Sequence, residues 1–538
     1  MRILLVTGHL AEPLIRHAAQ TIALNHFCDV LVLPQTVAAF LHPKYVAAQL
    51  GKQKSIGNYD LILLPGMVSG DTILVREATK IPSYKGTRHA ADLPILLNLI
   101  AQGQVSLSTT EPADYIITEE RTNSALKELD AAEKGPLPGK HEPKTICIDK
   151  GRQSLFAGPN YPMRIIAEII DAPQKTDQEL CQLASYFYSS GANIIDIGMI
   201  ANIPDSQAAS HIIKIVRKAV PIPISIDSTD PKELIAGIEA GATFVISLDQ
   251  DNMTKIPPQL RKHAAFTVIP AAQSGQSLPK AVKDRVQLLT ENLRIAEKLG
   301  YTTLIADPLC DPIITPGLTQ AIQAYTTFAK EQPNIPLLMG IGNVTELLDA
   351  DTPGANAVLA GIATEIGATF LLTTEASQKT RGSVWELYRA SQMMYLAQRR
   401  QAHPKDLGID LLLLKTKRFP ENPYSELEDV STQDVSDTAL THKLDPSGYF
   451  TFHIDRQKQC LVARHYPSVG AETPDAVFAA GTAKQILAAI LAHETISRLD
   501  HATYIGFELA KAEIALITGR PYIQDEPLFT RWSPAPKD

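Results

Sequence analysis

Short apolar runs alternate with helix-patterned segments along most of the chain. The rhythm is most regular over residues 145–401, where each apolar run is followed by a segment with helical spacing. The eight runs are Arg164–Ile170, Asn193–Met199, Ile222–Asp227, Phe244–Leu248, Ala265–Pro270, Thr303–Asp307, Pro336–Ile341 and Thr369–Thr374. Eight strand–helix units in this length are typical of a (β/α)8 TIM barrel, and an open doubly wound sheet is the alternative. We predict the barrel.

The two ends of the chain carry different patterns. Residues 1–140 alternate apolar runs at 2–7, 29–34 and 59–65 with helical segments, which predicts a small parallel α/β domain. Residues 441–538 open with a hairpin pattern and continue as helices from Thr482 and from about Asp500, which predicts a small α+β domain. The polar stretch 402–440 and the Pro- and Gly-rich stretch 131–144 are predicted linkers.

Composition narrows the function classes. The formal net charge is −8 and no basic block stands out, which argues against a nucleic-acid partner. No apolar run reaches the length of a membrane span, and the N-terminal residues have the pattern of a strand rather than a signal peptide. The five cysteines are far apart and form no CxxC pair, which favours a reducing, cytoplasmic location. A small-molecule ligand is therefore expected.

Acidic residues recur where the predicted barrel strands end, and in a barrel these positions face the ligand. They include Asp171, Asp196, Asp227 and Asp307. Each one alone is more often a helix cap or a loop residue. Together they would repel one another unless a ligand rich in N–H donors relieved the charge. A pterin ring presents such an edge, because its 2-amino group and N3–H suit a carboxylate fork.

Three segments carry a resemblance to a known family. GANIIDIG (191–198), PIPISIDSTDPKELIAGIEAGATFVISL (221–248) and LIADP (304–308) resemble the pterin-binding superfamily of dihydropteroate synthases and methyltetrahydrofolate-dependent methyltransferases. The resemblance implies that Asp227 and Asp307 bind the pterin ring, with Asp196 beside them. Ser247 stands where the superfamily usually has asparagine, so we expect a shorter or water-mediated contact there.

The whole chain is similar to archaeal-type dihydropteroate synthase-related proteins. The segments VTGHLAEP (6–13), LLPGMVSGD (63–71), KGTRHAADLP (85–94) and HATYIGFELAKAEIAL (501–516) carry this likeness at the two ends. The resemblance implies a role in tetrahydromethanopterin biosynthesis, with a pterin and an arylamine as substrates. Barrels of the superfamily are often dimers, so it also implies a homodimer.

The chain departs from the dihydropteroate synthase pattern at the diphosphate end of the site. The usual Ser-Arg-Lys after the seventh strand is replaced by MGIGN, whose Asn343 matches the asparagine that approaches the pterin in the methyltransferases. The Arg-x-His pair after the eighth strand is absent. Lys379 and Arg381 are the candidates to bind phosphate in its place, and Asp171 is a candidate ligand for Mg²⁺.

Three functions stay open at this stage, and no catalytic residue is assigned. The first is condensation of a dihydropterin methyl diphosphate with an arylamine, which the resemblance favours. The second is methyl transfer from a methyl-tetrahydropterin, and the third is non-catalytic pterin binding in a biosynthetic complex. In the N-terminal domain the stretch Lys85–His89 could touch a phosphate, although a solvated loop is the simpler interpretation.

Overall fold

The structure is a computed structural model. It describes residues 1–20, 27–52, 54–103, 105–134, 144–149, 154–272, 278–415, 417 and 443–529. The chain divides into two compact units. The first comprises residues 1–375 and 382–413, and the second comprises residues 376–381 and 414–538. Most of both predicted linkers (135–143, and 418–440 with residue 416) lies outside the described residues, so the predicted domain boundaries stay a prediction.

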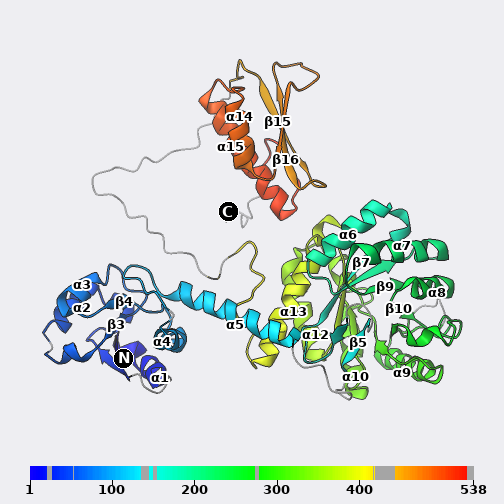
Figure 1. Ribbon diagram of the computed structural model, residues 1–538, viewed down its shortest axis with the longest axis horizontal. Coiled ribbons are helices and arrows are strands. Elements are labelled where there is room, and N and C mark those ends of the chain that lie inside the picture. The colour runs from blue at the N-terminus through cyan, green and yellow to red at the C-terminus, as the bar shows by residue number, and fades with distance from the viewer. Residues whose placement is uncertain are drawn as a thin grey trace, which may run out of the picture. The chain divides into compact units, whose positions relative to one another are not determined.

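The predicted barrel is confirmed. Eight parallel strands lie in the order β12-β11-β10-β9-β8-β7-β14-β13. A bridge between Ala306 of β12 and Leu337, directly before β13, joins the two ends of this list and closes the ring. The strands lie inside a layer of helices (Figure 1). The strands are β7 (Arg164–Ile169), β8 (Ile194–Gly198), β9 (Ile224–Asp227), β10 (Phe244–Leu248), β11 (Ala265–Val268), β12 (Leu304–Ala306), β13 (Leu338–Gly340) and β14 (Phe370–Thr374).

Helices cover the outside of this ring, and apolar side chains from both layers form the largest core of the molecule. The helices are α6 (Asp177–Ser189), α7 (Ser206–Ala219), α8 (Pro231–Ala240), α9 (Val282–Lys298), α10 (Leu318–Glu331), α11 (Gly342–Thr345), α12 (Thr352–Ile366) and α13 (Ser383–Arg399). One expectation was wrong: the segment between β10 and β11 contains turns and the short 3-10 helix η6 (Leu260–Lys262) in place of a full helix. Oδ1 of Asp249 accepts hydrogen bonds from the backbone amides of Asp251 and Asn252, and such local bonds favour turns over a helix.

A two-stranded sheet fills the amino end of the barrel. β5 (Ile146–Ile148) and β6 (Leu155–Ala157) pair antiparallel. Their Ile148 and Ala157 pack inside the ring against residues near the strand starts, such as Phe244 and Phe370. The end left for a ligand is therefore the carboxyl end, where barrel enzymes place their chemistry.

The N-terminal part has an open parallel sheet in the order β2-β1-β3-β4. Its strands are β1 (Arg2–Thr7), β2 (Phe27–Val32), β3 (Leu61–Leu64) and β4 (Ser83–Lys85), of which β4 was not predicted. Apolar residues of α1 (Glu12–Gln20) and α4 (Leu93–Ala101) form the core on one face. Those of α2 (Pro43–Leu50) and α3 (Ile73–Thr79) form the core on the other, and the helix α5 (Asp114–Lys134) follows.

The C-terminal part is the predicted small α+β fold. β15 (Tyr449–Asp455) and β16 (Cys460–Tyr466) form the expected hairpin, and β17 (Ala476–Ala480), which was not predicted, extends the sheet. Helices α14 (Ala483–Ala492) and α15 (Leu499–Thr518) pack on it. Within the described residues, no helix is both long enough and apolar enough to span a membrane. The cytoplasmic location and the homodimer stay predictions.

Candidate functional site

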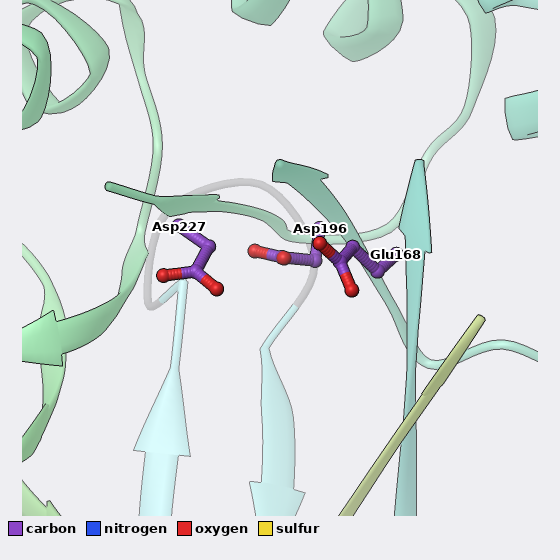
Figure 2. A group of neighbouring side chains, drawn as sticks. All are labelled: Glu168, Asp196 and Asp227. Atoms are coloured by element: carbon purple, nitrogen blue, oxygen red, sulfur yellow. The ribbon is translucent and has the colours of Figure 1, made fainter. Parts of the chain in front are cut away.

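Three carboxyl groups meet at the carboxyl end of neighbouring barrel strands (Figure 2). Glu168 comes from β7, Asp196 from β8 and Asp227 from β9, and their oxygens lie within 4.8 Å of one another. Glu168 lies opposite Asp196 in the strand register, so the two side chains share a face of the sheet. We call these three residues the carboxyl cluster.

Glycine at position 198 makes room for this cluster. A Cβ atom there would lie 2.5 Å from Oε1 of Glu168, closer than atoms tolerate. Gly198 therefore allows the Glu168 carboxyl group to turn into the mouth of the barrel, which is the reason a residue without a side chain suits the end of β8.

Asp196 is fully buried and only partly hydrogen-bonded. Its Oδ1 accepts a hydrogen bond from the hydroxyl of Ser225. Its Oδ2 has no partner among the described residues. Buried acceptors are rarely left without a donor, so this oxygen has room for a donor that a ligand brings.

Asp227 is held in place by a serine from the next strand. The hydroxyl of Ser247 donates to Oδ1 of Asp227 over 2.7 Å. Ser247 has a φ of 68°, a left-handed conformation that is uncommon for serine, and its carbonyl accepts from Nδ2 of Asn252. Ser247 therefore orients Asp227, and a contact between Ser247 and a ligand stays a prediction.

Asp307 lies across the mouth, directly after β12. It is buried and accepts hydrogen bonds from the Tyr325 hydroxyl and from the amide of Leu309, the latter over 2.8 Å. Asn343 is exposed in the short helix α11 after β13, and its Nδ2 donates to the carbonyl of Cys310 over 3.0 Å. The structure thus connects Asn343 to the loop that carries Asp307.

These carboxyl groups hold protons more tightly than usual. Burial, then the charges of Asp227 and Asp171, raise the pKa of Glu168 to about 8. Burial and the charges of Asp227 and Glu168 raise the pKa of Asp196 well above its usual value. Burial also raises the pKa of Asp227, and it raises that of Asp307 to about 6 against the opposing hydrogen bond from Tyr325. At neutral pH the site therefore contains both charged and protonated carboxyl groups.

Comparisons with known proteins fit this geometry. Residues 171–372 match the model of a family described as pterin binding enzymes. The uncharacterized protein MJ0107 of Methanocaldococcus jannaschii is 35% identical over 542 residues, covering 98% of this chain and 99% of that protein. The chain belongs to the pterin-binding superfamily.

Other matches concern separate parts of this pterin-binding superfamily member. Residues 444–525 match the family PterinBD-DUF4346. The Ycf91-like protein of a Nostoc strain is 32% identical over 124 residues, covering 18% of this chain and 97% of that protein. The solved dihydropteroate synthase of Xanthomonas albilineans in complex with 7,8-dihydropteroate is 18% identical, with a TM-score of 0.38, over 48% of this chain and 100% of that one.

The remaining predicted residues lie elsewhere. Asp171 is exposed in the loop after β7, with a φ of 46°, and is not part of the carboxyl cluster. Lys379 lies in the 3-10 helix η7 (Gln378–Thr380), directly before Arg381, and this segment groups with the second compact unit. Their roles in metal and phosphate binding stay predictions.

Glu168 was missed by the sequence interpretation. It lies inside an otherwise apolar strand, RIIAEI, rather than at its end. An acidic residue at an inward position of a buried strand is costly unless it has a function, and this was the signal that could have identified it.

Proposed function

We propose that the mouth of the barrel binds a reduced pterin, with Asp227 and Asp307 as its main contacts and Asp196 and Asn343 beside them. The observation that carries this proposal is the carboxyl cluster, in which no described residue donates a hydrogen bond to the buried Oδ2 of Asp196. The 2-amino group and the ring N–H groups of a pterin are donors of the required kind.

The mixed protonation of the site also suits a pterin. A pterin presents N–H donors next to the carbonyl oxygen at C4, so its partner needs acceptors and a donor side by side. Asp227 supplies the acceptor. Glu168, whose pKa burial raises to about 8, keeps a proton at neutral pH and supplies the donor. This complementarity selects a pterin over a simple cation.

The reaction that we propose is the dihydropteroate synthase type, as a step of tetrahydromethanopterin biosynthesis. The nitrogen of an arylamine forms a bond to the exocyclic methylene carbon of a dihydropterin methyl diphosphate. The bond from that carbon to the diphosphate oxygen breaks, and the amine loses one proton. The amine lone pair needs no strong base, so the main demands are orientation and stabilisation of the leaving group.

Dihydropteroate synthase chemistry is expected to use Mg²⁺, so the acidic residues at the mouth of the barrel are compared with the needs of that ion. Carboxylate oxygens are the ligands that Mg²⁺ prefers, but the carboxyl cluster is assigned here to the pterin, so Asp171, in the loop after β7, remains the candidate ligand for the ion. When bound, Mg²⁺ would neutralise charge on a leaving diphosphate. Lys379 and Arg381 remain the candidate phosphate contacts.

Amine-dependent release of diphosphate tests this function. The full chain is incubated with the pterin diphosphate and 4-aminobenzoate as the arylamine. We expect release that needs the amine, is lost in Asp227→Asn, and persists in Asp230→Asn, because Asp230 caps α8 outside the cluster. Tight pterin binding with no release would instead support the non-catalytic scaffold.

A second function, methyl transfer from a methyl-tetrahydropterin, is favoured by a specific observation. Methyl departure from N5 is easier once N5 is protonated, and Glu168, whose pKa is raised to about 8, is a suitable donor. No cobalamin-binding D-x-H-x-x-G motif occurs in the chain, so a corrinoid acceptor would be on another protein. Demethylation by a supplied cobalamin without added Mg²⁺ would support this alternative.

A further inference from the structure

The N-terminal sheet has a crevice that the barrel chemistry does not use. With the order β2-β1-β3-β4, the chain leaves β1 toward one edge of the sheet and returns at β3 on the other side of β1. The core with α1 lies on one face and the core with α2 on the other, so β1 and β3 flank the switch point of the topology. In open α/β sheets, ligands bind at the carboxyl ends of the strands at this point.

A cavity of about 80 Å³ lies at that place. Its lining is mostly apolar and comes from both sides of the switch point, with Leu5 of β1, Leu63 of β3 and Leu93 of α4. Three polar residues complete the lining: Thr7, Thr87 and Arg88. Pockets for drug-sized ligands are several times larger, so this cavity excludes a dinucleotide and suits a single small group.

The loop that carries Arg88 is firmly held. The amide of Gly86 donates to the carbonyl of Leu64 over 2.7 Å, and the amide of Gly66 donates to the carbonyl of Thr87 over 3.1 Å. A Cβ on Gly66 would lie 2.6 Å from the carbonyl oxygen of Gly86, so only glycine permits this approach. The amide of Arg88 donates to Oδ2 of Asp114 over 3.0 Å.

The stretch Lys85–His89 is solvated only at its end, where Arg88 is partly buried and His89 is exposed. Lys85 ends β4 and is buried, and Thr87 is buried as well. Arg88 lines the cavity, and the hydrogen bonds of its loop fix the backbone that carries it, so the loop itself needs little ordering when a ligand binds.

We propose that this crevice binds a small, largely apolar molecule that carries one anionic group, a phosphate or a carboxylate. The apolar body lies against Leu5, Leu63 and Leu93. The anionic group lies against Arg88, because a guanidinium fork pairs with either anion through two parallel hydrogen bonds. The proposal is independent of the function assigned to the barrel.

Isothermal titration of the full chain with phenyl phosphate and with benzoate tests the site and tells the two anions apart. Inorganic phosphate, which lacks an apolar body, should bind more weakly than phenyl phosphate. We expect Arg88→Met to weaken binding of the preferred probe by about 10-fold or more, because one charge-assisted pair is lost. Arg88→Lys should recover part of the affinity.

Three further variants keep the test decisive. Arg76→Met removes an exposed arginine from α3 of the same domain and should leave the affinity unchanged. Ala38→Leu keeps Arg88 but places bulk in the cavity that Ala38 lines, and it should abolish binding. Asp227→Asn, in the barrel, should leave the affinity of the N-terminal crevice for its probe unchanged. Failure of the wild type to bind either aromatic probe, or equal affinity in Arg88→Met, would overturn the proposal.

Discussion

Two parts of the molecule bury an aspartate in opposite ways. In the C-terminal part, Asp445 accepts hydrogen bonds from the amides of Ser447, Ser497 and Arg498 and from the Ser497 hydroxyl. Nδ1 of His501 lies 3.0 Å from its Oδ2. In the barrel, Asp196 is buried more deeply, yet its Oδ2 has no partner among the described residues.

The proton affinities differ accordingly. Burial acts to raise the pKa of Asp445, but the hydrogen bonds from Ser497, Ser447 and His501 outweigh it and lower the pKa well below its usual value. Burial and neighbouring charges raise the pKa of Asp196, and the hydrogen bonds from Ser225 and from the Ile197 backbone offset only part of that rise. A buried carboxylate with a full set of donors stabilises the fold, whereas one without them is suited to a ligand.

The largest expected effect is on stability at Asp445. Asp445→Asn removes the charge that several donors share, and we expect a loss of about 3 kcal/mol in the free energy of unfolding. Denaturant titration of the full chain, followed by a probe in the C-terminal part, measures it. Asp500→Asn, at a surface ion pair with Arg498, is the matched control and should cost far less. An equal loss of unfolding free energy in the two variants would show that the hydrogen bonds to Asp445 do not stabilise the fold.

In the barrel, Asp227→Asn should reduce affinity rather than stability. We expect about 30-fold weaker binding of a dihydropterin, which corresponds to about 2 kcal/mol for a lost charge-assisted contact. Pterin fluorescence titration gives the affinity. Asp230→Asn should retain the helix cap, because asparagine caps helices as well as aspartate does, and it should leave affinity unchanged. Unchanged affinity in Asp227→Asn would remove this residue from the pterin site.

The pH dependence of stability should have opposite signs in the two regions. Glu168 has a folded pKa raised to about 8 from 4.5 by burial and by Asp227 and Asp171, so the folded state binds more protons between these values. The free energy of unfolding should therefore fall as pH rises through this window. Asp445 has a depressed pKa, so its contribution is lost only as pH falls through its low folded value.

Glu168→Gln isolates the barrel part of this pH effect. Unfolding midpoints measured across that pH window should decline less steeply in the variant than in the wild type. Glu179→Gln, in the exposed capping box of α6, should not flatten the decline. An identical slope in Glu168→Gln and the wild type would show that Glu168 is not protonated in the folded barrel.

The smallest effect concerns the residue that orients Asp227. Ser247→Ala removes the hydrogen bond that lowers the pKa of Asp227, so that pKa should rise further. We expect about 5-fold weaker pterin binding, equivalent to about 1 kcal/mol for one hydrogen bond. Ser228→Ala, whose hydroxyl bonds Glu233 instead, is the control and should bind pterin normally. Wild-type affinity in Ser247→Ala would show that Asp227 needs no such support.

Much of the fold was predictable because apolar periodicity is local information. The runs at Arg164–Ile170 and Phe244–Leu248 became β7 and β10 to within one residue. The strands that escaped prediction are short or partly exposed, such as Ser83–Lys85, so their own pattern is weak. Pairing with a longer neighbour makes them strands, and pairing is not visible along the chain.

The sequence by itself determined the barrel, with Asp196 on its second strand and Asp227 and Asp307 where later strands end, because the length and polarity of a strand are local properties of the sequence. Only the tertiary structure decided that Glu168 joins them and that Ser247 bonds Asp227. Only the structure showed that Asp445 is hydrogen-bonded by groups far from it in the sequence, such as the amide of Ser497 and Nδ1 of His501. Proton affinity depends on which donors and charges surround a carboxyl group in space, and that environment exists only after folding.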